Sequence, residues 1–126
     1  METMLTNFLL TYNGVTQKSL SRLGLSRFLA HDTPFAALAR AADGSAVLHI
    51  RLDRQTICEL SARYADCIKP SHFYDPRFWI ETPLHDGLTD SVIKHALVRA
   101  YIRVINALSP LSRTAELQAE PVSYKK

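Results

Sequence analysis

Glycine is scarce in this chain, and its scarcity excludes several classes of enzyme. The 126 residues include four glycines, and none belongs to a glycine-rich phosphate loop or to a Gly-x-Ser-x-Gly motif. Cysteine is equally scarce, because Cys58 and Cys67 are the two present and their spacing fits neither a zinc site nor a redox motif. We therefore expect a protein that is not an enzyme and has no cofactor, with two reduced, mostly buried thiols and a disulfide as the less favoured alternative.

Long hydrophobic runs are also missing. No stretch approaches the roughly 18 consecutive apolar residues of a membrane span, and residues 1–4 lack the cationic region of a secretory signal. We therefore expect a cytoplasmic protein without membrane contact. By length, residues 1–110 should form one domain, and the polar residues 111–126 should form a flexible tail.

Acidic side chains are missing from much of the C-terminal half. After Asp90, no Asp or Glu occurs until Glu116. The formal net charge is +3, and most of the 15 cationic side chains are arginine, whose planar guanidinium can bind two phosphate oxygens at once. This mild cationic excess permits nucleic-acid binding without requiring it.

Apolar residues at helical spacing predict three helices. Residues 4–12 should form a short helix that Asn13-Gly14 ends, and Asp53 should cap a second helix that ends near Asp66. Residues 89–108 should form the longest helix, with Thr89 or Asp90 as its cap.

The remaining patterns predict an antiparallel sheet. Residues 46–52 alternate between apolar and polar, and the Asp43-Gly44 turn before them predicts a hairpin with residues 35–40. The pattern of residues 15–33 is ambiguous, with one strand expected near residues 23–29. Residues 67–74 and 77–84 are expected to be extended, as a rigid ribbon or as edge strands, because prolines interrupt them. Helices and strands in this order indicate a two-layer α+β fold with a long C-terminal helix.

An ordered series of motifs begins at Phe35-Ala36-Ala37-Leu38 and continues through Lys69-Pro70-Ser71 to Trp79 and a final helix that carries Tyr101. In this series the chain resembles the MmcQ/YjbR family. Ten positions of the family read Pro-Gly-Tyr-His-Leu-Asn-Lys-Arg-His-Trp, and here they read Pro70-Ser71-His72-Phe73-Tyr74-Asp75-Pro76-Arg77-Phe78-Trp79. Proline, arginine and tryptophan are retained, whereas phenylalanine replaces both histidines and Pro76 replaces the lysine.

The resemblance implies a bacterial protein whose fold is similar to that of CyaY-like proteins and of type III secretion chaperones. Members of the family are described as having a double-wing DNA-binding arrangement, so the resemblance also implies a DNA-binding role. This implication comes from similarity of fold.

The predicted C-terminal helix supplies the first candidate DNA contacts. His95, Arg99 and Arg103 follow one another at i, i+4 and i+8 and form a cationic ridge, with Lys94 alongside. The alternative is an ordinary solvated helix face, because every surface helix exposes polar residues.

The segment from Lys69 to Trp79 supplies a second group, in which Lys69, His72 and Arg77 could contact DNA. Its aromatic residues, Trp79 above all, are expected to pack beneath the sheet instead. Ser71, His72 and Glu81 are the polar residues there that suggest acid–base chemistry, which would require them to meet within hydrogen-bond distance.

A third group lies on the predicted strands. Arg51 and His49 should point outward on the alternating strand, and Arg40 lies across the hairpin from them. Ordinary exposed strand residues are the alternative. The histidines at 31, 72 and 85 are in no metal-ligand spacing, so we expect no metal site.

These observations favour a small DNA-binding protein that contacts duplex phosphates through one Arg- and Lys-rich face, with weak sequence preference. The alternative is a protein-interaction module of secretion-chaperone-like architecture without a nucleic-acid role. The DNA hypothesis depends on whether cationic groups from separate segments come together in the folded chain.

Overall fold

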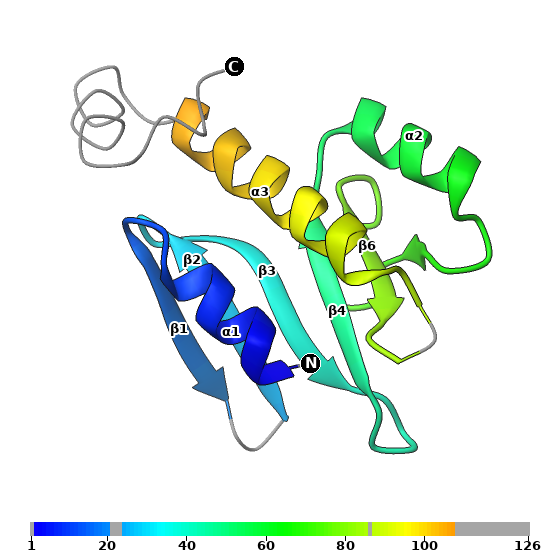
Figure 1. Ribbon diagram of the computed structural model, residues 1–126, viewed down its shortest axis with the longest axis horizontal. Helices are drawn as coiled ribbons and strands as arrows, with labels where there is room; N and C mark the ends of the chain where they lie inside the picture. Colours follow the sequence, from blue (N-terminus) through cyan, green and yellow to red (C-terminus); the bar gives the residue numbers. More distant parts are fainter. Residues whose placement is uncertain (1, 21–23, 86, 108–126) are drawn as a thin grey trace.

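The computed structural model describes residues 2–20, 24–85 and 87–107. In chain order the elements are α1 (Glu2–Leu10), β1 (Val15–Leu20), β2 (Leu25–Ala30), β3 (Thr33–Arg40), β4 (Ala46–Arg51), α2 (Arg54–Arg63), β5 (Lys69–Pro70), β6 (Trp79–Pro83) and α3 (Asp90–Ala107) (Figure 1). The predicted flexible tail, residues 111–126, and the first residue of the predicted 86–87 turn lie outside the described residues.

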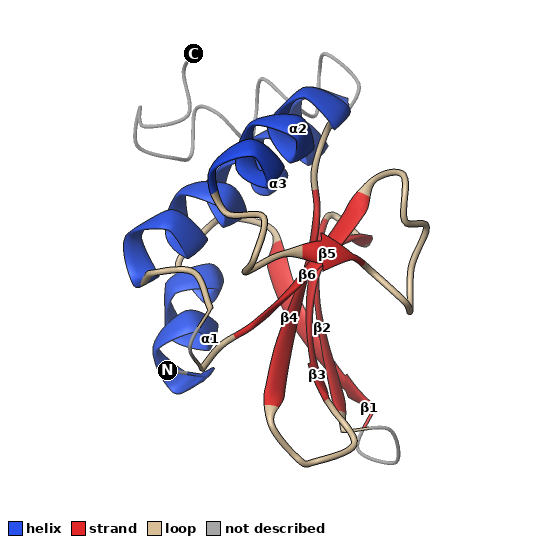
Figure 2. Ribbon diagram, turned by 90° about the vertical axis from the view of Figure 1, so that its right-hand side faces the viewer, coloured by secondary structure: helices blue, strands red, loops and turns tan. Residues whose placement is uncertain are grey.

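The strands form one antiparallel sheet in the order β1-β2-β3-β4-β6-β5. The helices lie on one side of this sheet, and the loop between β5 and β6 lies on the other (Figure 2). The predicted two-layer α+β fold with a long C-terminal helix is therefore confirmed. We call the two sides the helix face and the open face.

The core lies between the sheet and the helices. Residues at alternate strand positions, such as Leu48 and Ile50, point to the helix face, where α1 and α3 cover them. The Tyr101 hydroxyl donates a hydrogen bond of 2.7 Å to the Asn13 carbonyl and so joins α3 to the chain that follows α1. The largest fully buried side chains in this layer include Leu5, Leu9, Phe28, Phe35, Ile93, Leu97, Tyr101 and Ile105.

Local capping explains where the two later helices begin. The Asp53 carboxylate accepts a hydrogen bond of 3.0 Å from the Thr56 backbone N–H, as predicted. The Thr89 hydroxyl accepts one of 3.4 Å from Val92 N–H and opens α3. The predictions for α2 and α3 are confirmed, although α2 ends at Arg63, three residues before Asp66.

The segment that was ambiguous in the sequence forms the hairpin of β1 and β2 and the turn into β3. His31 and Asp32 make that two-residue turn with positive φ angles of 50° and 66°, a conformation usually supplied by glycine. β1, with the sequence VTQKSL, is mostly polar because it is an edge strand. Neither the turn nor the strand carries the usual sequence signal.

Three predictions for the open face and one for α2 are wrong. Of the two extended segments, only Lys69–Pro70 and Trp79–Pro83 are strands, and β6 has a neighbour on each side instead of lying at an edge. His49 is completely buried, not outward, because the loop of residues 71–78 covers it. Trp79 is buried as expected, whereas Phe73 is 53% exposed. Cys58 is also exposed, and both thiols are free.

Candidate nucleic-acid interface

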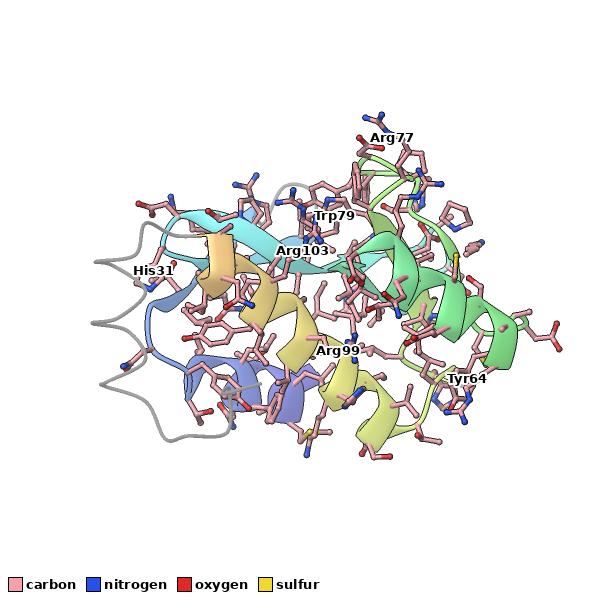
Figure 3. The ribbon with its side chains drawn as sticks, turned by 90° about the horizontal axis from the view of Figure 1, so that it is seen from above. His31, Tyr64, Arg77, Trp79, Arg99 and Arg103 are labelled. Carbon is pink, nitrogen blue, oxygen red and sulfur yellow. The ribbon has the colours of Figure 1, made fainter. Side chains whose placement is uncertain are left out.

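The helix face carries a cationic groove. Helical periodicity places His95, Arg99 and Arg103 on the exposed side of α3, where they line an open groove of about 580 Å³ beside the start of α2. Leu52, Val98 and Ile102 supply the apolar part of its lining, with Asp53, Thr56 and Asn106 as further polar members. Figure 3 shows Arg99 and Arg103 along α3.

Arg51 extends this groove. It lines a second hollow, of about 400 Å³, together with Arg103, Thr33 and the last turns of α3. Arg103 lines both hollows, so Arg51, the last residue of β4, adjoins the row of His95, Arg99 and Arg103 at its Arg103 end, and we call these four residues the cationic groove.

The cationic groove keeps most of its positive charge. Among the described residues, no carboxylate forms an ion pair with Arg51, Arg99 or Arg103. The pKa of Asp53 is lowered, mainly by its hydrogen bond with Thr56 and further by the charges of Arg99 and Arg103. That single capping carboxylate cannot neutralise three guanidinium groups.

Two predicted contacts lie away from the groove. The Lys94 ammonium lies 5.4 Å from the centre of the Phe8 ring and so faces α1. Arg40 donates from Nη1 to the Gly44 carbonyl at 3.3 Å, which fastens the β3–β4 hairpin.

The contacts predicted in the loop lie on the open face and are paired with carboxylates. Arg77 donates from Nη2 to Asp75 at 2.7 Å, and its hydrogen bonds hold the pKa of Asp75 at about 2. Lys69 lies 3.8 Å from Glu81, which also accepts from the His72 ring. Arg77 lies well apart from Arg99 and Arg103 (Figure 3). The predicted cations therefore divide between two faces, and those on the loop are partly neutralised.

A buried polar network holds the loop on the sheet. The Ser71 hydroxyl oxygen accepts backbone N–H groups of Phe73 and Tyr74, each at 3.1 Å, and lies 2.9 Å from His49 Nδ1. Because both backbone donors occupy that oxygen, its proton is left to donate to Nδ1. His49 then carries its own proton on Nε2, a buried atom without a hydrogen-bond partner in the described structure.

Burial and hydrogen bonding set the charges of this network. Burial lowers the pKa of His49 against the opposing pull of Glu81, so its ring is neutral at pH 7. Burial opposes ionisation of Glu81, but hydrogen bonds from the His72 ring and backbone N–H outweigh it and lower the pKa of Glu81. The network supports the loop and leaves the Ser71 oxygen buried and occupied, which suits a structural role and not a nucleophile.

Two cations on the open face were missed by the sequence analysis. Lys18 of β1 lies directly opposite Arg27 of β2 in the sheet. The same row continues through Ala37 of β3 to His49 of β4. Both cations lie in the segment 15–33, whose strand pairing the sequence did not reveal. Only the register of the sheet could have placed them beside the loop.

The comparisons with known proteins decide the fold. The structure superposes on the crystal structure of DR2400 from Deinococcus radiodurans, which has a DUF419 domain, with a TM-score of 0.79 and 14% identity over 91% of this chain and 86% of that chain. The chain has the MmcQ/YjbR fold. A second structure, of a protein from Pseudomonas syringae, matches with a TM-score of 0.67 and 11% identity over 80% of this chain and 96% of that chain.

The resemblance to the MmcQ/YjbR family is thus confirmed for the fold. No family model matches the sequence, and no curated protein matches it. Among the described residues, no helix could cross a membrane, and no cluster of three or more His, Cys, Asp or Glu side chains could hold a metal ion.

Proposed function

We propose that this protein binds duplex DNA through the cationic groove on its helix face. Arg51, Arg99 and Arg103 would contact phosphate oxygens, with His95 at the end of the row. Contacts of this kind position a protein on DNA without reading its bases, so the sequence preference would be weak.

The observation that supports this proposal most directly is the unpaired state of the groove arginines. A guanidinium that is already bound to a carboxylate must give up that partner before it binds a phosphate. Arg99 and Arg103 have no such partner among the described residues and lie one helical turn apart, about 5.4 Å along the axis. They can therefore contact neighbouring phosphates without first breaking an ion pair.

A duplex titration at rising salt tests the proposal. Each neutralised phosphate contributes about −0.9 to the slope of log K against log salt concentration. The Arg99→Ala/Arg103→Ala variant should bind more weakly to every sequence and should lose about two such increments of slope.

Arg77→Ala is the matched control, because it removes one exposed arginine that Asp75 already occupies on the other face. It should leave duplex affinity nearly unchanged. A loss in Arg77→Ala at least half as large as the loss in the double variant would point to net charge alone and would contradict the assignment to the groove. A wild-type protein that does not bind duplex at low salt would contradict it too.

The apolar part of the groove supports a second candidate, a protein-interaction module. Leu52, Val98 and Ile102 would suit the apolar side of an acidic amphipathic helix, while the arginines bind its carboxylates. Ile102→Gln discriminates between the two functions. It should weaken binding of such a peptide and leave phosphate contacts, and therefore duplex affinity, unchanged.

A further inference from the structure

We propose that the open face of the sheet binds single-stranded nucleic acid, with bases stacked on Phe73 and His72 and the backbone on Lys18, Arg27 and Lys69. This surface is separate from the cationic groove and goes beyond duplex binding. We call these five residues the strand-binding face.

The register of the sheet aligns the cations with the aromatic rings. One row of paired residues crosses the sheet, and alternation along each strand points all of its members to the open face. Neighbouring strands are about 4.8 Å apart, so the first and last members of the row, Lys18 and Lys69, are separated by roughly 24 Å, enough for several nucleotides. The row runs Lys18, Arg27, Ala37, His49, Glu81, Lys69.

The rings lie above the middle of that row. Phe73 is stacked on His72, with centroids 4.7 Å apart and planes 26° from parallel, and lies 5.2 Å from the buried His49 ring. Phe73 is 53% exposed, although an exposed phenylalanine ring is unfavourable in water. Base stacking on aromatic side chains would bury this surface and tolerates any base.

The rings are held in place before any ligand arrives. Ser71 fixes the backbone of Phe73 and Tyr74, Glu81 binds His72 through both its ring and its backbone N–H, and Tyr74 is stacked on Trp79 at 4.0 Å. A side chain that is already ordered loses little conformational entropy when a ligand binds. This support distinguishes Phe73 and His72 from a side chain that is exposed by chance.

The charges on this face favour a polyanion. Lys18 and Arg27 are like charges directly opposite one another, and neither has an ion-pair partner among the described residues. Such a pair repels, and an anion between the two side chains would relieve the repulsion. Arg27 lies close enough to Tyr74 for its charge to oppose the rise that burial causes in the pKa of the Tyr74 hydroxyl. Arg27 therefore lies beside the aromatic loop.

An unpaired strand fits this surface better than a duplex does. Stacking requires an exposed base face, and the bases of a duplex are already stacked on one another. Single strands of DNA and of RNA both offer exposed base faces and a phosphate backbone. The strand-binding face would recognise these shared groups, and the experiment below distinguishes DNA from RNA.

The test measures anisotropy of labelled oligothymidine and oligouridine of about 12 nucleotides at low salt. Phe73→Ala should weaken binding about tenfold, whereas Phe73→Tyr, which keeps an aromatic face, should bind like the wild type. Leu10→Ala is the matched control, because Leu10 is the other exposed large hydrophobic side chain in the described structure, at 43%. Circular dichroism verifies that the variants are folded.

The cations are tested by salt dependence. Lys18→Ala/Arg27→Ala, which removes the two cations without an ion-pair partner among the described residues, should reduce the slope of log K against log salt concentration by about 1.4, at about 0.7 per phosphate contact on a single strand. Equal affinity for the two oligonucleotides would show that the site accepts both DNA and RNA strands. Higher affinity for oligouridine would identify RNA as the preferred ligand.

The inference would be overturned if neither oligonucleotide binds, or if Phe73→Ala leaves the affinity unchanged. It would also be overturned if Phe73→Leu binds like the wild type, since leucine keeps apolar area without a π face. Loss of oligonucleotide binding in Arg99→Ala/Arg103→Ala would also overturn it, because the strand would then occupy the groove. If duplex binding fails while Phe73-dependent oligonucleotide binding persists, the proposed function fails and this inference stands.

Discussion

His49 determines how the open face responds to acid. Its ring lies beneath the loop of residues 71–78, with the Ser71 hydroxyl at Nδ1 and the Glu81 carboxylate 3.9 Å away. The titratable groups that face it are Glu81 from β6 and His72 from the loop, while Arg27 of β2 acts on the neighbouring Tyr74. A neutral ring fits this place, and a protonated ring would have to be buried with its charge.

This environment predicts a loss of stability in two pH windows. The pKa of His49 lies below its usual 6.5, so the unfolded chain takes up a proton that the folded chain refuses. The free energy of unfolding should therefore begin to fall as the pH drops through about 6.5. The pKa of Glu81 lies below its usual 4.5, so its contribution is present above that pH and is lost as the pH falls through its folded value.

Urea unfolding between pH 8 and pH 3 measures both windows. His49→Phe, which keeps a ring but cannot titrate, should abolish the upper window while leaving the lower one. His95→Gln is the control, because it removes a histidine that lies exposed on α3, away from Ser71 and Glu81. A His49→Phe protein that still loses stability between pH 6.5 and pH 5 would contradict the assignment.

At the scale of elements, the start of α2 has two functions. Asp53 caps the helix, and its carboxylate lies close enough to Arg99 and Arg103 for their charges to lower its pKa. The residue that stabilises α2 therefore also reduces the positive potential of the cationic groove.

Two substitutions separate these functions. Asp53→Asn keeps an acceptor for Thr56 N–H and removes the negative charge, so duplex affinity should rise at low salt with little loss of stability. Asp53→Ala removes the charge and the cap, so it should raise affinity similarly while costing about 1 kcal/mol of stability. Thermal unfolding and a duplex titration check both, and equal stability of the two variants would contradict the capping role.

The elements also show what the sequence could predict. α2 and α3 followed from apolar spacing and from a cap within a few residues, which are local signals. The His31-Asp32 turn lacks glycine and β1 lacks an apolar face, so the local pattern there was silent. The burial of His49 was beyond prediction because a loop more than 20 residues later covers it, whereas local alternation suggested an exposed strand position.

At the scale of the molecule, the candidate contacts form two surfaces separated by the sheet and the helix layer. The ridge on α3 was predictable because one helix carries it, but its union with Arg51 and its separation from Arg77 depend on how the elements pack. The pairing of Lys18 with Arg27 depends on strand register alone. Long-range arrangement, not residue type, therefore decides which cations act together.

This arrangement predicts that duplex and single strand bind together. An α-helix with its side chains is about 10 Å thick, so the helix layer alone separates the two ligands by at least one Debye length at 0.1 M salt, which is about 10 Å. A labelled oligothymidine should therefore keep its affinity when the groove is saturated with duplex at that salt. At 0.01 M salt the Debye length is about 30 Å, and repulsion between the two polyanions should weaken the second binding event. Complete displacement of the oligonucleotide by duplex at 0.1 M salt would show that both ligands use one surface, and the Phe73→Ala and Arg99→Ala/Arg103→Ala variants would identify which.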